Sequence, residues 1–84
     1  MELTDLPNVG PVLAGNLRIV GVMTPEDLRR LGAEEAWLRV RLKIDSGACL
    51  HQLQALAGAV AGVPKKDLSP ERRGELQTFF DSHK

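Results

Sequence analysis

The chain has 84 residues, a length that fits one domain spanning residues 1–84, and its 43% hydrophobic and 26% charged residues are ordinary for a globular protein. Eleven basic and eleven acidic side chains cancel, which argues against the strong positive field of a dedicated nucleic-acid or membrane-surface protein. A single cysteine cannot form an internal disulfide, and no apolar run approaches the ~20 residues of a membrane span, so we expect a soluble cytoplasmic domain.

The first predicted helix covers residues 10–20. Pro11 suits a first helical turn, where its missing N–H would have no partner within the helix. Gly21 follows as a stop, because glycine accepts the positive φ that is common at helix ends. Leu13 and Leu17 lie at helical spacing, which predicts that they face a core.

The second predicted helix has the clearest start in the sequence. Thr24 is a favoured N-cap and Pro25 suits the first helical position, so we expect the helix to begin there and to end at Gly32. Asp27 occupies the position at which a capping box carries Glu or Gln, which predicts an imperfect box. A helix of about two turns is not stable alone, so packing must hold it in place.

A third helix is predicted over residues 33–43. Acidic residues open this segment and basic residues close it, in agreement with the helix dipole, and Glu35 and Arg39 form an i,i+4 pair. Its apolar residues predict a broad buried face, made by Trp37, Val40 and Ile44 with Leu38 and Leu42 beside them.

The fourth segment, residues 48–61, is the most apolar and is predicted to be the central helix. Alanines and Gly58 make its second half thin, which would let another helix approach closely. Cys49 is expected on its buried side, where it would act as a small hydrophobic residue. Gly62 is expected to end the helix.

Residues 63–68 are predicted to form a loop before a last helix, which Ser69 caps and Pro70 opens. The buried side of this helix is predicted to consist of Leu76, Phe79 and Phe80. Residues 82–84 are expected to fray. Because no segment alternates apolar with polar residues for long, the pattern predicts an all-α fold, a compact orthogonal packing of about five short helices.

One motif stands out near the N-terminus. The run Leu6-Pro7-Asn8-Val9-Gly10-Pro11, with Ala14 four residues after the glycine, resembles the helix-hairpin-helix pattern, in which a tight turn enters a helix. Gly10 would allow a turn too tight for a Cβ, and the N–H groups of the turn and helix start could then hold a phosphate oxygen. Asn8 stands where such hairpins carry glycine, and asparagine accepts positive φ better than most residues.

The wider sequence resembles the C-terminal domain of the TfoX/Sxy competence regulators. The resemblance covers about residues 3–80 and rests on blocks that occur in order: residues 6–11, 21–28 and 31–33, Trp37-Leu38-Arg39, Cys49-Leu50, Leu53, Leu56, Gly58-Ala59 and Leu68. It implies a small helical domain related to helix-hairpin-helix and SAM-like folds. In that family the domain is often fused behind a separate N-terminal domain, and versions that stand alone also occur.

The turn and the nearest cations define a candidate nucleic-acid site. Its members are residues of the turn and helix start, the first cation after them and two lysines of the later loop, namely Asn8, Val9, Gly10, Val12, Arg18, Lys65 and Lys66. Two related hairpins would place the loop of the lysines symmetrically with residues 7–11. The structural alternative is that the turn only joins and packs helices and that the charged runs are salt-bridged surface.

The sequence gives little support to enzymatic or metal chemistry. Cys49 and His51 lie two positions apart on a predicted helix and point to different sides, and His83 lies near the chain end, so we predict no metal site and no cofactor. The three serines are caps or tail residues, which predicts no catalytic triad and no small-molecule substrate. Trp37 and Leu50 are candidate interface residues, because an apolar side chain left open can anchor a partner.

Two functions from different classes follow. The first is a non-enzymatic regulatory or interaction domain that acts through a protein partner or through self-association. The second is weak, sequence-independent nucleic-acid binding through the hairpin-like turn. The zero net charge and the uncharged residues that follow the turn favour the first.

Overall fold

Five α-helices and two short 3-10 helices make up the part of the chain that the computed structural model describes, residues 1–83. The elements are η1 (Leu3–Asp5), α1 (Pro11–Ile19), α2 (Pro25–Leu31), α3 (Ala33–Lys43), α4 (Leu50–Ala61), η2 (Lys65–Asp67) and α5 (Pro70–Ser82). No strand occurs in this range, so the predicted all-α class is confirmed. The 3-10 helix η1 was not predicted, and η2 forms within the predicted loop. None of these helices is long and apolar enough to cross a membrane.

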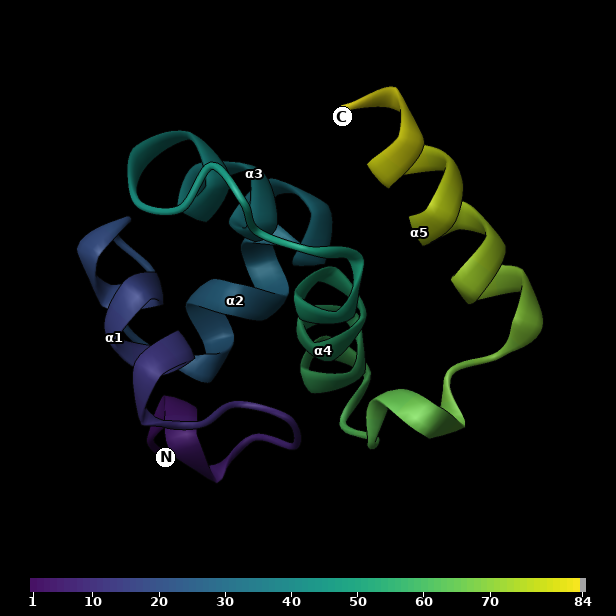
Figure 1. Ribbon diagram of the computed structural model, residues 1–84. Coiled ribbons are helices and arrows are strands. Elements are labelled where there is room, and N and C mark those ends of the chain that lie inside the picture. The colour runs from purple at the N-terminus through teal and green to yellow at the C-terminus, as the bar shows by residue number, and fades with distance from the viewer. Residues whose placement is uncertain (84) are drawn as a thin grey trace.

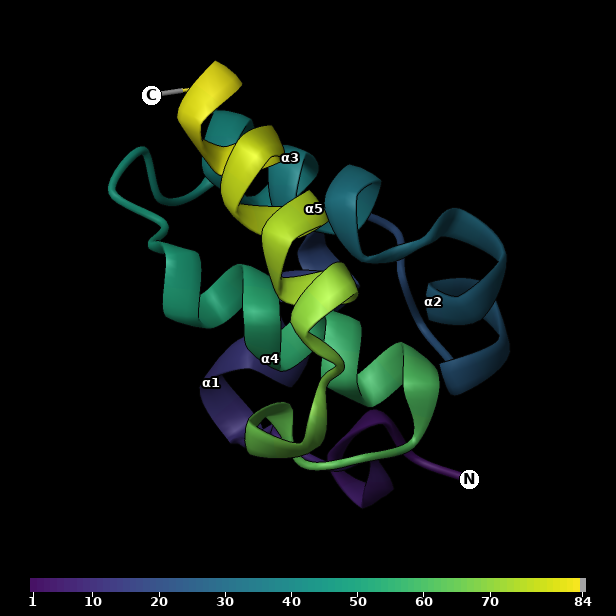
Figure 2. The same cartoon turned by 90° about the vertical axis from the view of Figure 1, so that its right-hand side faces the viewer.

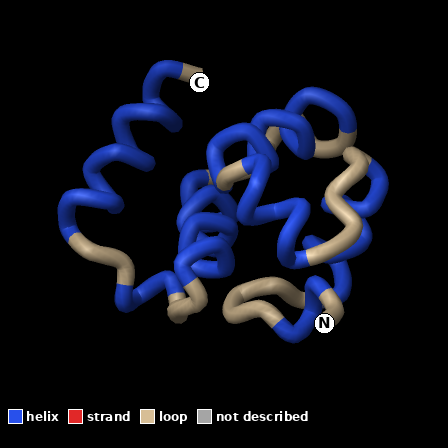
Figure 3. The backbone as a smooth tube through the Cα atoms, turned by 180° about the vertical axis from the view of Figure 1, so that it is seen from behind, coloured by secondary structure: helices blue, strands red, loops and turns tan. Residues whose placement is uncertain are grey.

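Helix α4 lies in the middle of the arrangement, as its apolar composition predicts. Figure 1 shows α1, α2 and α3 on one side of α4 and α5 on the other. After a quarter turn, α5 lies in front of α4 and crosses it (Figure 2). The view from behind again shows α4 between α5 and the group of the first three helices (Figure 3).

Apolar side chains from every α-helix and from η1 build the core. The large side chains that are fully buried include Leu3, Leu17, Leu28, Trp37, Leu53, Leu56 and Leu76. Burial of each leucine stabilises the fold by about 1.5–3 kcal/mol relative to exposure. Because each α-helix contributes at least one such residue, even the two-turn helix α2 is held by packing, as its length requires.

The N-terminal caps of α2 and α5 form as predicted. The Thr24 hydroxyl accepts a hydrogen bond from the Asp27 amide at 3.1 Å, and the Ser69 hydroxyl accepts one from the Arg72 amide at 3.1 Å. The expectation of an imperfect capping box at α2 is wrong. Asp27 Oδ2 accepts from the Thr24 amide at 3.2 Å and from the Met23 amide at 3.1 Å, so the shorter acid still closes the box.

Glycine ends helices α1, α2 and α4 where the sequence predicts it, and Gly32 caps α2 with φ of 89°. Gly21 follows α1 with φ of 91°, and Gly62 follows α4 with φ of 77°. Both values lie in the region that a Cβ disfavours, so the chain reverses direction at these positions at little steric cost.

The start of α4 differs from the prediction. Asp45 Oδ1 accepts from the Gly47 amide at 3.0 Å, and the Ala48 amide donates to the Asp45 carbonyl at 3.0 Å. This turn keeps residues 46–49 out of the helix, which begins at Leu50 rather than at residue 48. Cys49 is therefore an exposed cap residue, and its prediction as a buried hydrophobic residue is wrong.

The buried face of α3 is narrower than predicted. Trp37 and Val40 are fully buried, and Leu38 packs against the core. Leu42, in the last turn of α3, is 80% exposed, and Ile44, the residue that follows the helix, is 38% exposed. These two residues do not belong to the core to which the sequence assigned them.

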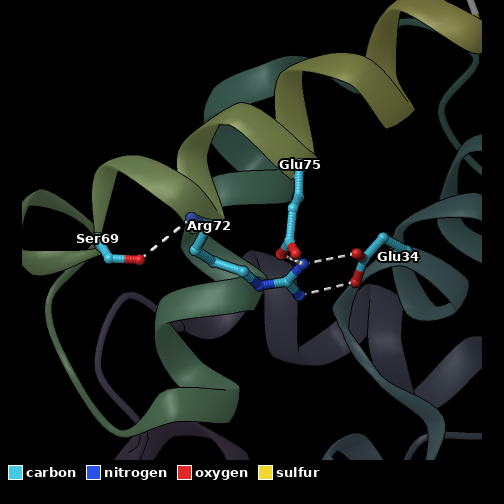
Figure 4. Close-up of polar contacts among 4 residues, drawn as sticks. All are labelled: Glu34, Ser69, Arg72 and Glu75. Carbon is cyan, nitrogen blue, oxygen red and sulfur yellow. Dashed lines mark hydrogen bonds and ion pairs between the residues drawn. The ribbon is translucent and has the colours of Figure 1, made fainter.

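A bidentate ion pair joins α3 to α5. Arg72 Nη1 and Nη2 donate to the two carboxylate oxygens of Glu34 at 2.7 and 2.8 Å, and Nη1 also donates to Glu75 at 3.2 Å (Figure 4). The hydrogen bonds from Arg72 lower the pKa of the Glu34 carboxyl below its ordinary value, and those to Glu34 raise the pKa of Arg72. The ion pair links α3 to α5, which also pack against each other through Trp37, Phe79 and Phe80.

The end of α5 is more ordered than predicted. The helix continues to Ser82, whose hydroxyl donates to the Thr78 carbonyl at 2.9 Å. The His83 ring lies 2.8 Å from the Phe79 carbonyl through Nδ1, and its centroid is 4.2 Å from the Phe79 ring. Of the residues expected to fray, only Lys84 lies outside the described range.

Candidate functional site

The turn before α1 is fastened to the connection after α4 by the side chain of Asn8. Its Nδ2 donates to the Val63 carbonyl at 3.1 Å and to the Ala55 carbonyl at 3.3 Å. Its Oδ1 accepts from the Lys65 amide at 3.1 Å. We call this arrangement of Asn8, Val63 and Lys65 the Asn8 corner. Asn8 has φ of 69°, as the asparagine at this position predicts, and is the one non-glycine residue with positive φ in residues 1–83.

Gly58 makes room for this corner. A Cβ on Gly58 would lie 2.5 Å from Asn8 Nδ2 and 2.7 Å from the Val63 carbonyl oxygen. The Val63 amide also donates to the Gly58 carbonyl at 2.9 Å, so the returning chain lies directly against α4. The sequence predicted a close approach at this thin part of α4, but the approaching group is the Asn8 side chain and a loop rather than another helix.

Arg73 supports the same corner from α5. Its Nη2 donates to the carbonyls of Lys65 and Lys66 at 3.1 and 2.8 Å, and its Nε donates to the Leu68 carbonyl at 3.3 Å. The backbone of η2 is thereby fixed, while the side chains of both lysines remain exposed. The structure thus brings Asn8 and the two lysines together.

Gly10 does not have the role predicted for it. Its φ is −90° and ψ is −179°, an extended conformation open to any residue, and a Cβ would meet nothing within 4 Å. The positive φ of the turn lies at Asn8 instead, because the asparagine amide stabilises that conformation through its three hydrogen bonds. The expectation of a turn at Gly10 too tight for a Cβ is wrong.

The remaining predicted nucleic-acid residues are dispersed. Val9 is buried beneath the turn. Arg18 lies in the last turn of α1, at the end away from the Asn8 corner, and forms an ion pair with Glu2 at 3.9 Å. Pro11 has no N–H, so the start of α1 offers the amides of Val12 and Leu13 as free donors. Two donors and two lysines are a small set for binding phosphates.

Trp37 is unavailable as an interface anchor. It is 0% exposed, its Nε1 donates to the Cys49 carbonyl at 3.2 Å, and the rings of Phe79 and Phe80 lie 6.0 and 5.6 Å from it. The assignment of Trp37 to an interface is therefore corrected to the core. Leu50 is half-buried and packs against that core.

The outer face of α1 carries the apolar surface that the sequence analysis missed. Val12 is 79% exposed and Ile19 is 69% exposed. They are seven residues apart, which places them two helical turns apart on one side of α1. The spacing of Val12 and Ile19 is present in the sequence, but it does not show whether another element covers these two residues. We call Val12 and Ile19 the outer face of α1.

The comparisons with known proteins agree with the predicted resemblance. The family model of the TfoX C-terminal domain matches residues 1–80. Protein Sxy of Escherichia coli (strain K12) is 39% identical over 81 residues, which are 96% of this chain and 38% of Sxy. The chain therefore spans little more than a third of the length of this relative.

Two solved structures share the fold closely. An uncharacterized protein from Listeria monocytogenes, in a triclinic form, matches with a TM-score of 0.95 and 39% identity over 98% of this chain and 92% of that chain. A protein of unknown function from Listeria monocytogenes, in a tetragonal form, matches with a TM-score of 0.94 and 39% identity over 98% of this chain and 99% of that one.

The fold and these matches define a small all-α domain of the competence-regulator type. The chain belongs to the TfoX C-terminal domain family. The resemblance inferred from its sequence blocks is confirmed. The domain occurs as a minor part of Sxy and as nearly the whole of the Listeria chains.

Proposed function

We propose that this chain is a non-enzymatic, cytoplasmic regulatory domain that acts by binding a protein partner through the outer face of α1. Membership of the TfoX C-terminal domain family supports the regulatory class. The exposure of Val12 and Ile19 is the observation that supports binding of a protein partner at this face. Single exposed apolar residues are common, whereas two large ones aligned on one short helix form an apolar strip, here interrupted by Gly15 and Asn16.

The strip is suited to a helix or loop lying along α1. Its two ends are about 10 Å apart, from seven residues at a rise of 1.5 Å. Between them, Gly15 has no atom within 4 Å of where a Cβ would stand, so the face is open on the Gly15 side of Asn16. An apolar side chain of a partner could therefore enter between Val12 and Ile19.

The small size of the face favours a tethered partner over a second copy of the chain. A stable interface buries about 800 Å² on each partner, roughly a sixth of the 4709 Å² surface of this domain. A nine-residue helix alone offers less than this. A covalently joined partner needs less area, because tethering gives an effective concentration in the millimolar range.

The occupant we propose is the part of a longer relative such as Sxy that lies outside the matched region. More than half of Sxy is not covered by this domain. The ion pair of Glu2 with Arg18, at 3.9 Å, links the side chain of residue 2 to the last turn of α1. A segment that joins the domain at its first residue would therefore begin one residue before this ion pair.

A hybrid protein tests the proposal. This chain replaces the matched 81 residues of Sxy, and methyl resonances of the hybrid are compared with those of the isolated chain. We expect the Val12 and Ile19 methyl groups to shift in the hybrid, and Ile19→Lys to return the Val12 resonance to its position in the isolated chain. Leu42→Lys is the matched control, because Leu42 is equally exposed but lies on α3.

Two results would contradict the proposal. In one, the α1 methyl groups resonate at the same positions in the hybrid and in the isolated chain. In the other, the isolated chain sediments as a dimer that Ile19→Lys dissociates, which would assign the face to a second copy of the chain.

A second candidate function rests on the Asn8 corner. The hydrogen bond from the Lys65 amide to Asn8 holds two exposed lysines beside the turn that resembles a hairpin. We infer that any nucleic-acid binding here is weak, independent of sequence and lost at moderate salt, because few phosphates can be contacted. Titration of a labelled duplex at low and high salt tests this inference, and sub-micromolar binding that resists salt would contradict it.

A further inference from the structure

A small hollow lies between the loop that follows α1 and helices α2 and α3. It is open to solvent, has a volume of about 200 Å³ and is lined by Gly21, Val22, Asp27, Arg30, Leu31 and Arg39. None of these residues belongs to the outer face of α1 or to the Asn8 corner, so the hollow is a separate feature.

Two arginines, Arg30 from α2 and Arg39 from α3, line the hollow. Arg39 Nε donates to Glu35 at 3.4 Å, and within residues 1–83 its two terminal nitrogens have no hydrogen-bond partner. The nearest acid to Arg30 is Asp27 at 3.7 Å, which is longer than a hydrogen bond. Each guanidinium has five N–H donors, so most of those at this hollow are unused by the protein.

The acid in the hollow is already engaged elsewhere. Asp27 Oδ2 accepts from the amides of Met23 and Thr24 at 3.1 and 3.2 Å, which fixes the carboxylate at the start of α2. It cannot move toward Arg30 without losing the cap of that helix. The loose pairing of Arg30 therefore follows from the role of Asp27 in capping.

We propose that this hollow binds a small oxyanion, a phosphate or carboxylate group, between Arg30 and Arg39. The planar fork of an arginine matches the paired oxygens of both groups. A volume of about 200 Å³ equals roughly seven water molecules at ~30 Å³ each, enough for such a group. It lies below the range of about 300–1,000 Å³ that is typical of sites for larger ligands.

The surroundings limit the affinity. The Arg30 side chain is 80% exposed and that of Arg39 is 44% exposed, so water screens the attraction of both guanidinium groups for an anion. The carboxylates of Asp27 and Glu35 compete for the same guanidinium groups. We therefore expect a dissociation constant on the order of 1–10 mM for the isolated ion.

Titration of the full chain with sodium phosphate and, separately, with sodium acetate tests the proposal. Ionic strength is held constant with sodium chloride, and the amide resonances of Val22 and Leu31 are followed. We expect saturable shifts in at least one of the two titrations. Tighter binding of phosphate would assign the site to phosphate groups, and tighter binding of acetate would assign it to carboxylates.

Three variants separate a defined site from general attraction to positive charge. Arg30→Gln and Arg39→Gln should each weaken binding by tenfold or more, with thermal unfolding midpoints that show an intact fold. Arg29→Gln is the matched control, because Arg29 lies on the same helix, pairs with Glu26 at 3.7 Å and does not line the hollow. Shifts that do not saturate with either anion, or an equal loss of binding in Arg29→Gln, would overturn the proposal.

Discussion

Substitution of Gly58 by alanine should destabilise the domain, although alanine is the better helix former. The new Cβ would stand 2.5 Å from Asn8 Nδ2 and 2.7 Å from the Val63 carbonyl oxygen, distances that real Cβ atoms do not show. The Asn8 side chain would have to leave, and its three hydrogen bonds would be lost with it. The chain at Val63 would also have to move away from α4.

The magnitude follows from these contacts. Each hydrogen bond contributes about 0.5–1.5 kcal/mol net, and water at this exposed corner replaces part of that, so the loss is about 1–3 kcal/mol. Overpacking against the Val63 carbonyl adds about 1–3 kcal/mol. The higher helix propensity of alanine returns about 1 kcal/mol. We expect a net loss of roughly 1–5 kcal/mol, which lowers the melting temperature of a domain of this size by at least about 4 °C.

Thermal and urea unfolding of matched variants is the assay. Gly74→Ala is the control, because Gly74 lies within α5 and a Cβ there meets nothing within 4 Å. That variant should be stabilised by up to about 1 kcal/mol. Asn8→Gly keeps the positive φ but removes the amide, so Gly58→Ala should cost at least about 1 kcal/mol less in that background. An increase in stability for Gly58→Ala equal to that for Gly74→Ala would refute the reasoning.

Three further predictions concern single residues. Glu34→Gln should reduce stability by about 1 kcal/mol at pH 7. Because folding lowers the pKa of Glu34, its contribution is present above the ordinary value of 4.5 and is lost as the pH falls through the lowered value, so urea midpoints of the variant and the parent should converge in acid. Gly10→Val should cost no more than about 1 kcal/mol in a urea melt, since only a cap residue of ordinary φ is changed; a larger loss would restore the tight-turn interpretation. Cys49 should react with a thiol reagent in the native protein as fast as in urea, because it is exposed, and slow native labelling would place it in the core instead.

The sequence predicts the helices well because their ends carry strong local signals. Thr24 with Pro25 and Ser69 with Pro70 combine a cap with a residue that fits only the first turn, and both helices begin there. The error at Cys49 has a local cause that is harder to see. Asp45 accepts hydrogen bonds from the Gly47 and Ala48 amides. The turn that results competes with the helical conformation that residues 46–49 could otherwise adopt.

The candidate sites were predicted less well, because they depend on contacts between residues far apart in the chain. Asn8 and Lys65 are 57 positions apart, and nothing local indicates that the asparagine amide binds that backbone. Likewise, the need for glycine at position 58 arises from the arriving Asn8 side chain and not from the φ of the helix. The apolar pattern of α1 indicated Leu17 as a core residue, but it could not indicate that Val12 and Ile19 would be left without a covering element.

Rotational diffusion of the hybrid of this chain with Sxy tests the central claim most directly, since a docked domain tumbles with the rest of the protein. Nitrogen-15 relaxation of the amides in α3 and α4 gives the correlation time of the domain in the hybrid, with and without Ile19→Lys. We predict the long correlation time of the whole protein for the parent hybrid and a shorter one for the variant. A correlation time in the parent hybrid equal to that of the isolated chain would contradict the account.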